Sequence, residues 1–193
     1  MTRTRRYQLM WLLAVIGLAT VSLGLLAFFR APLWTVALVA LLFFIPGRIQ
    51  GHYYRDLFTG SKLMDAHRWS DALSPLESFL AKVRAQPRLK KLVWFGGIYT
   101  HDVEAMALNN IGAVHLELGE LEAAEAPLRE ALAVDASYPI PLVNLAVLAS
   151  LRGDREGAAA AAAEAKRLGF DGSRIDTLIR QGQSMIAAAE GRV

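Results

Sequence analysis

Histidines and neighbouring carboxylates are the side chains in this sequence that could bind a metal ion or move a proton. His101, Asp102 and Glu104 form one polar group, but a metal site needs further ligands, and no nearby spacing supplies them. No nucleophile with a paired base stands out, no glycine-rich loop joins a strand to a helix, and the chain contains no cysteine. We therefore expect no enzyme activity, no metal site and no cofactor.

A different set of residue types recurs at a fixed distance along the chain. Small and apolar residues mark one 34-residue frame at Leu108, Ile111, Gly112, His115, Gly119, Ala124, Leu128 and Ala131. The next frame carries Leu142, Leu145, Ala146, Ala149, Gly153, Ala158, Ala162 and Ala165 at the corresponding positions. Helical spacing interrupted by a glycine predicts two short helices joined by a tight turn. Two such hairpins that agree over the full period predict an array of repeats.

This pattern resembles the tetratricopeptide repeat, most specifically over 105–172 and more loosely over about 53–190. In a degenerate first copy, 53–86, His67 stands where the turn glycine is expected. His115 takes an aromatic core position, so we expect a packed structural histidine there. The resemblance implies an all-α fold, a short helical-repeat solenoid, and a capping helix from Ser173 with one apolar face.

In this family the first helix of each repeat lines a concave groove that binds extended or helical segments of partner proteins. The resemblance places eight residues there: Met106, Asn109, Asn110, Ala113, Ile140, Val143, Asn144 and Val147. Chaperone-tail-binding members also carry groove lysines and arginines, whereas Leu57, Ser61 and Ile140 stand at the equivalent places here. We expect a weakly apolar groove with amide groups from Asn110 and Asn144. Alternatively, these asparagines satisfy polar groups between helices.

Two apolar runs precede the repeats. Residues 10–29 carry no charge over 20 positions, about 30 Å of helix, which predicts a transmembrane helix. A second, shorter run ends at Pro46, and together they predict a transmembrane helical hairpin over 10–48. Arginines lie before the first run and after the second, with only Arg30 between them, which predicts cytoplasmic ends. If the second run does not span, the repeats face the periplasm.

Positive charge is concentrated near these runs, with 13 Lys or Arg against 6 Asp or Glu in residues 1–104. The acidic remainder argues against a nucleic acid partner, so we expect a protein partner and membrane lipids. An 18-residue insertion, 87–104, mixes basic and aromatic residues. The predicted membrane-interface residues are Arg3, Arg5, Arg6, Arg48, Arg88, Lys90, Lys91, Trp94 and Phe95. The alternative is a connector that folds its aromatic residues onto the first repeat.

The predicted organisation has a basic tail (1–9), a transmembrane hairpin (10–48), a degenerate repeat with its insertion (49–104), two repeats (105–172) and a capping helix with tail (173–193). Heavy use of Ala, Arg and Gly suggests a bacterial source. We expect an integral protein of the bacterial cytoplasmic membrane, with its termini and repeats cytoplasmic. Its expected function is a membrane-anchored adaptor that recruits or assembles a partner protein. The alternatives are a membrane-complex subunit or assembly factor whose hairpin is the specific element, or a periplasmic envelope factor.

Overall fold

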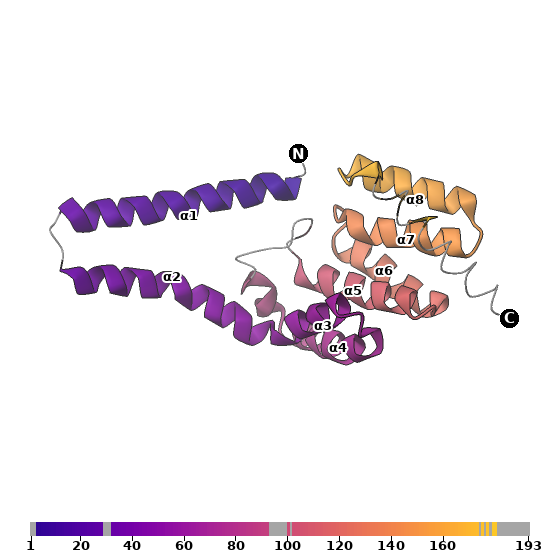
Figure 1. Cartoon of the computed structure of the whole chain (residues 1–193), viewed down its shortest axis with the longest axis horizontal. Helices are drawn as coiled ribbons and strands as arrows, with labels where there is room; N and C mark the ends of the chain where they lie inside the picture. Colours follow the sequence, from indigo (N-terminus) through magenta and orange to yellow (C-terminus); the bar gives the residue numbers. More distant parts are fainter. Residues whose placement is uncertain are drawn as a thin grey trace.

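The computed structural model describes residues 3–28, 32–92, 100, 102–173, 175, 177 and 179–180. Within these ranges every regular element is a helix, as expected for an all-α chain (Figure 1). The α-helices are α1 (Arg3–Phe28), α2 (Leu33–Tyr53), α3 (Arg55–Asp65), α4 (Trp69–Ala85), α5 (Val103–Glu117), α6 (Leu121–Val134), α7 (Pro139–Leu151) and α8 (Arg155–Arg167). A 3-10 helix, η1 (Pro87–Leu92), follows α4.

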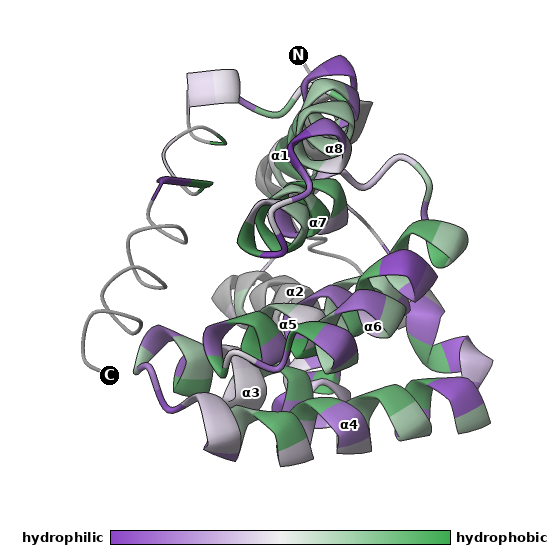
Figure 2. Cartoon of the chain, turned by 90° about the vertical axis from the view of Figure 1, so that its right-hand side faces the viewer, coloured by the Kyte–Doolittle hydropathy of each residue, from purple (hydrophilic) through white to green (hydrophobic). Residues whose placement is uncertain are grey.

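Six of these helices form three stacked hairpins: α3 with α4, α5 with α6, and α7 with α8 (Figure 1). The first helix of the middle hairpin, α5, also contacts α3 and α7, so the three first helices lie next to one another. Hydrophilic and hydrophobic residues alternate along α4, as expected for a helix with one buried face (Figure 2). Its apolar residues Ala72, Leu76, Phe79 and Val83 belong to a core shared with α5.

The two helices of each hairpin approach closely at one small residue. A methyl group added to Gly60 would lie 2.5 Å from Cγ of Leu76, and one added to Gly112 would lie 2.6 Å from Cγ of Leu128. Both leucines are fully buried. Ala146 and Ala162 stand at the corresponding positions of the third hairpin, where alanine replaces both the glycine and the leucine. The size of one partner therefore limits the size of the other.

The turns inside the hairpins require a left-handed backbone. Gly119 has φ +77° and Gly153 has φ +79°, and His67 adopts φ +55° at the corresponding place. The hydrogen bonds are those of a Schellman motif: the amide of Arg68 donates to the carbonyl of Leu63 as that of Glu120 does to His115. The first repeat thus keeps the turn geometry although a residue with a Cβ occupies the glycine position.

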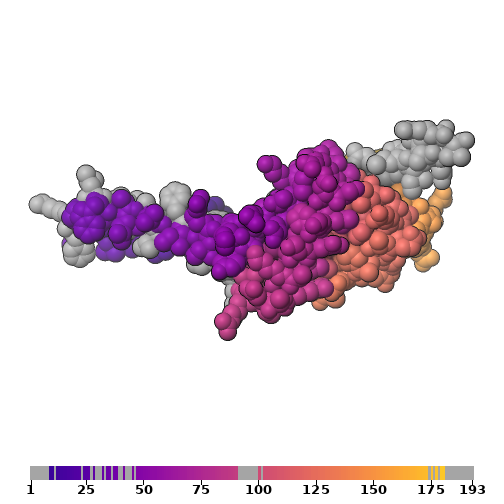
Figure 3. All heavy atoms as spheres, turned by 90° about the horizontal axis from the view of Figure 1, so that it is seen from below, coloured from indigo at the N-terminus to yellow at the C-terminus, as the bar shows by residue number. Residues whose placement is uncertain are grey.

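The helices α1 and α2 run antiparallel, contact each other and form an arm that extends from the stack (Figure 3). Large apolar side chains on the arm are exposed, including Leu18 (60%) and Trp34 (66%). Where α2 meets the stack, Gln50 and Tyr54 become buried. The arm and the first repeat therefore join through packed side chains.

The predicted transmembrane hairpin is wrong. Among the helices that the structure describes, none combines the length and apolar character needed to cross a membrane. The prediction depended on the number of uncharged residues between charges. The helices that contain these residues also have polar ends: α1 begins at Arg3, and α2 continues through Arg48 and His52. The expected location as an integral protein of a bacterial cytoplasmic membrane, with cytoplasmic repeats, depended on this hairpin and is wrong for the same reason.

The start of the expected capping helix packs on the third hairpin. Ile175 is fully buried and Ile179 is partly buried, and both belong to a cluster with Val143 and Phe170. Residues 181–193 of the expected capping helix and tail lie outside the described residues.

The close approach at Gly112 gives a first prediction. Gly112→Ala should lower the free energy of unfolding by about 1–3 kcal/mol, because the buried Leu128 must move to admit the methyl group. Leu128→Ala alone should also destabilise by opening a cavity. The double variant, which copies the Ala146 and Ala162 pair, should be more stable than Leu128→Ala alone. Urea unfolding of all four proteins measures the coupling, and simple additivity would contradict the packing argument.

The turn at His67 gives a second prediction. His67→Gly should raise the free energy of unfolding by about 0.5–1 kcal/mol, since a left-handed backbone costs a residue with a Cβ roughly 1–2 kcal/mol. The gain is reduced by loss of the edge contact between His67 and the ring of Trp69. The reciprocal variant Gly119→His is the matched control and should destabilise. Thermal and urea unfolding test both, and a destabilised His67→Gly protein would show that the ring contact dominates.

Candidate functional site

The first helices α3, α5 and α7 present one shared face, which we call the first-helix face. Residues three or four apart lie on the same side of a helix, so each helix contributes a row. The rows are Phe58, Ser61 and Asp65 on α3; Asn110, Ala113 and Glu117 on α5; and Asn144, Val147 and Leu151 on α7. The start of α5 is fixed by Asp102, whose carboxylate accepts hydrogen bonds from the backbone amides of Glu104 and Ala105. Pro139 begins α7, where its missing N–H costs nothing.

Polar side chains connect the three rows. Nδ2 of Asn144 donates to Oδ1 of Asn109 at 2.9 Å, and Nδ2 of Asn110 donates to Oγ of Ser61 at 3.4 Å. Nδ2 of Asn109 points to Oδ1 of Asn110 at 3.5 Å, so the amides form a continuous chain from α7 to α3. Oδ1 of Asn144 accepts no hydrogen bond from the described residues. The asparagines therefore join helices and also leave an acceptor at one end.

The eight predicted groove residues separate by burial. Asn109 and Val143 are buried, with 4% and 2% exposure, and Val143 packs with Phe170 and Ile175 in the interior. Met106 and Ile140 are partly buried and pack against the two apolar clusters. The remaining four residues, Asn110, Ala113, Asn144 and Val147, are partly exposed. These four are the predicted residues that an incoming segment can reach on the first-helix face.

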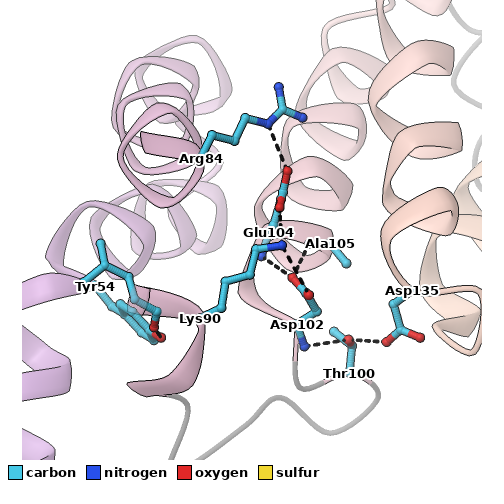
Figure 4. Close-up of polar contacts among 9 residues, drawn as sticks. Tyr54, Arg84, Lys90, Thr100, Asp102, Glu104, Ala105 and Asp135 are labelled. Carbon is cyan, nitrogen blue, oxygen red and sulfur yellow. Dashed lines mark hydrogen bonds and ion pairs between the residues drawn. The ribbon is translucent and has the colours of Figure 1, made fainter. Parts of the chain in front are cut away.

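Charged residues of the insertion form a separate cluster at the start of α5 (Figure 4). Nε of Arg84 lies 2.9 Å from Glu104, and Lys90 pairs with Glu104 and, at 3.6 Å, with Asp102. Arg84 also pairs with Glu130 on α6. Burial alone would raise the pKa of the Glu104 carboxyl, but hydrogen bonds from Lys90 and Arg84 outweigh it and hold that pKa below its usual value. The cluster joins α4, η1, α5 and α6.

Hydrogen bonds from two hydroxyl groups hold the same region. The hydroxyl of Tyr54 donates to the carbonyl of Leu89 at 2.5 Å, and burial, assisted by the charge of Asp102, raises its pKa to about 12. The hydroxyl of Thr100 donates to Asp135 at 2.5 Å and accepts from the amide of Asp102 at 3.1 Å. These bonds attach both ends of the insertion to the stack.

The structure places the predicted membrane-interface residues of the insertion differently from one another. The ammonium of Lys90 is held by two carboxylates, and its neighbour Leu89 is buried, so this part of the insertion faces the protein. Arg48 and Arg88 are exposed. Nothing is described for the side chains of Arg3, Arg5, Arg6 and Lys91, and Trp94 and Phe95 lie outside the described residues. From the sequence, the basic and acidic residues were treated separately and their pairing was missed. The available signal was the presence of opposite charges within one insertion.

The histidines take part in local contacts. Nδ1 of His115 lies 2.6 Å from Oε2 of Glu120 across the α5–α6 turn, and His52 packs edge-on against Tyr53 at 5.2 Å between ring centroids. The described residues contain no group of three or more possible metal ligands. His101 lies outside them.

Comparison with protein families matches residues 105–134 to the tetratricopeptide repeat. The match covers α5 and α6, the hairpin that contributes Asn109, Asn110 and Ala113 to the first-helix face. Searches of curated proteins and of solved structures found no match to the chain. This hairpin is thus similar to a class of helical repeats that generally bind protein partners, and the class supports a scaffold for protein interaction.

The charge cluster gives a third prediction. Glu104→Gln should destabilise the protein at neutral pH by about 1–2 kcal/mol, because Arg84 and Lys90 lose their shared anion. The folded pKa of Glu104 is lowered, so its contribution is present above its unfolded value of about 4.5 and is lost as the pH falls through the folded pKa.

The wild-type protein should therefore lose more stability than Glu104→Gln when acidified below that value. Urea unfolding at neutral and acid pH measures the difference. Glu122→Gln, at an exposed residue of α6 with no ion pair to a described residue, is the control and should follow the wild type. Parallel acid profiles for wild type and Glu104→Gln would contradict the role of the cluster.

Proposed function

We propose that the first-helix face binds a segment of a partner protein, so that the chain acts as a scaffold that recruits or assembles that partner. The observation that carries this proposal is the row of partly exposed residues across adjacent first helices, Asn110 and Ala113 on α5 and Asn144 and Val147 on α7. The similarity of residues 105–134 to a protein-binding repeat supports it.

The chemistry of the face suits recognition of a peptide or helix. Ala113 and Val147 offer small apolar surfaces. Oδ1 of Asn144, which accepts no hydrogen bond from a described residue, can take one from a backbone or side-chain donor. None of the four exposed residues is basic, so the face lacks the cations that would hold a terminal carboxylate. The proposed occupant is therefore an internal segment, bound through apolar contacts and hydrogen bonds.

The proposed activity is binding alone, with no catalysis and no nucleic acid. The side chains of the face are amides, apolar groups, carboxylates and the hydroxyl of Ser61, which accepts a hydrogen bond from Asn110 and has no base beside it among the described contacts. A phosphate backbone would require a basic surface, which these rows do not supply.

Obstruction of the face tests the proposal. Ala113→Trp places a large neutral side chain between the α5 and α7 rows, where it should block access with little effect on the core, because Ala113 is partly exposed. Ala113 is a better choice than Asn110 or Asn144, since both amides bond to neighbouring helices. The matched control is Ala123→Trp at an exposed position of α6. Both variants keep the apolar arm unchanged.

Each full-length protein is used to capture binding partners, which are quantified by mass spectrometry. Partners of the face should be retained by the wild type and by Ala123→Trp, and reduced about tenfold or more by Ala113→Trp, the loss expected when one central contact is blocked. Circular dichroism and urea unfolding confirm that both variants fold. Equal capture by all three folded proteins would overturn the proposed function.

A further inference from the structure

Two carboxylates end the rows of the first-helix face without an ionic partner. Asp65 is the last residue of α3 and Glu117 is the last residue of α5, and they occupy corresponding positions in the two repeats. Both are exposed, and neither forms an ion pair with a described residue. The exposed Lys62, one turn before Asp65, forms none either. Adjacent helices lie about 8–10 Å apart, so one bound segment can contact both carboxylates.

Local stability does not account for this placement. The last turn of a helix carries unpaired carbonyl groups and the negative end of the helix dipole, so an acidic residue there is unfavourable. Several carboxylates elsewhere in the stack are paired: Glu125 with Arg152, Glu130 with Arg84, and Glu164 with Arg167. The carboxylates that end two rows of the first-helix face are thus unpaired at helix C-termini, where negative charge is least favourable.

The rest of the face adds acceptors and apolar surface. Oδ1 of Asn144 accepts no hydrogen bond from a described residue, and no lysine or arginine stands in any of the three rows. Phe58, which replaces the asparagine of the other two rows, is 50% exposed. The three rows therefore offer acceptors and negative charge beside apolar side chains, and the nearest described cation is the exposed Lys62, one turn before Asp65.

We propose that the segment bound by the first-helix face is basic, with lysine or arginine next to apolar side chains. The apolar residues of that segment contact Phe58, Ala113 and Val147, and its cations lie against Asp65 and Glu117. This inference rests on the proposed function and specifies the chemistry of the partner. Charge complementarity of this kind selects the correct partner and increases its rate of association.

The test uses the full chain and two labelled synthetic amphipathic peptides with the same apolar residues, one with lysines and the other with glutamates at the polar positions. Fluorescence anisotropy measures binding to the wild type and to Asp65→Asn/Glu117→Gln. The matched control is Glu122→Gln/Glu156→Gln, which removes two exposed, unpaired carboxylates from α6 and α8. Both double variants change the net charge equally and leave the arm intact.

The lysine peptide should bind more tightly than the glutamate peptide. Asp65→Asn/Glu117→Gln should weaken its binding roughly fivefold, as expected for two exposed ion pairs, and added salt should remove the difference. The control pair should bind like the wild type. Asp65→Asn/Glu117→Gln should be at least as stable as the wild type, because it removes negative charge from two helix ends, so weaker binding cannot come from unfolding.

Equal binding of the two peptides, or an unchanged affinity in Asp65→Asn/Glu117→Gln, would overturn the basic-partner inference. Ala113→Trp separates this failure from failure of the proposed function. If Ala113→Trp blocks peptide binding while the charge variant has no effect, the face binds segments without selecting for basic ones. If the lysine peptide still binds to Ala113→Trp, the first-helix face is not its binding surface and both proposals are wrong.

Discussion

The stack depends on the close approach of two helices at one small residue in each hairpin. At Gly60 and Gly112 the backbone of the first helix lies against a buried leucine of the second, and alanines stand at both equivalent positions of the third hairpin. This contact sets how deeply the two helices pack, because neither partner can grow without displacing the other. Equal packing depth in successive hairpins aligns their first helices, and that alignment brings the asparagines of α5 and α7 within hydrogen-bond distance.

Polar contacts then fix the hairpins relative to one another. The amide chain from Asn144 through Asn109 and Asn110 to Ser61 holds the first helices together on one side of the stack. On the other side, Arg84 of α4 reaches Glu104 on α5 and Glu130 on α6. These contacts are directional, whereas apolar burial is not, so they define the register of neighbouring hairpins while the apolar core supplies most of the stability.

The sequence was informative where a local rule determines the structure. The turn at His67 was predictable because His67 stands where the other two repeats have glycine. The all-helical class followed from the apolar spacing. The pairing of Lys90 and Arg84 with Glu104 was not predictable, since it depends on how the insertion folds back onto the stack. The membrane prediction, which depended on a count of uncharged residues, is wrong: none of the described helices is long and apolar enough to cross a membrane. The eight groove positions were assigned by resemblance, but only burial separates Asn109 from Asn110.

The three rows of the first-helix face are equivalent in position and different in chemistry, which gives the face a direction. Phe58, Asn110 and Asn144 begin the rows, and Asp65, Glu117 and Leu151 end them. Aromatic surface and negative charge therefore lie toward α3, and neutral acceptor and aliphatic surface lie toward α7. A segment with its basic and apolar groups in one order matches this gradient, whereas the reversed segment places cations against Leu151 and loses the carboxylates. In the binding that we propose, divergence between repeats, which weakens the sequence pattern in the first copy, gives the bound segment one favoured orientation.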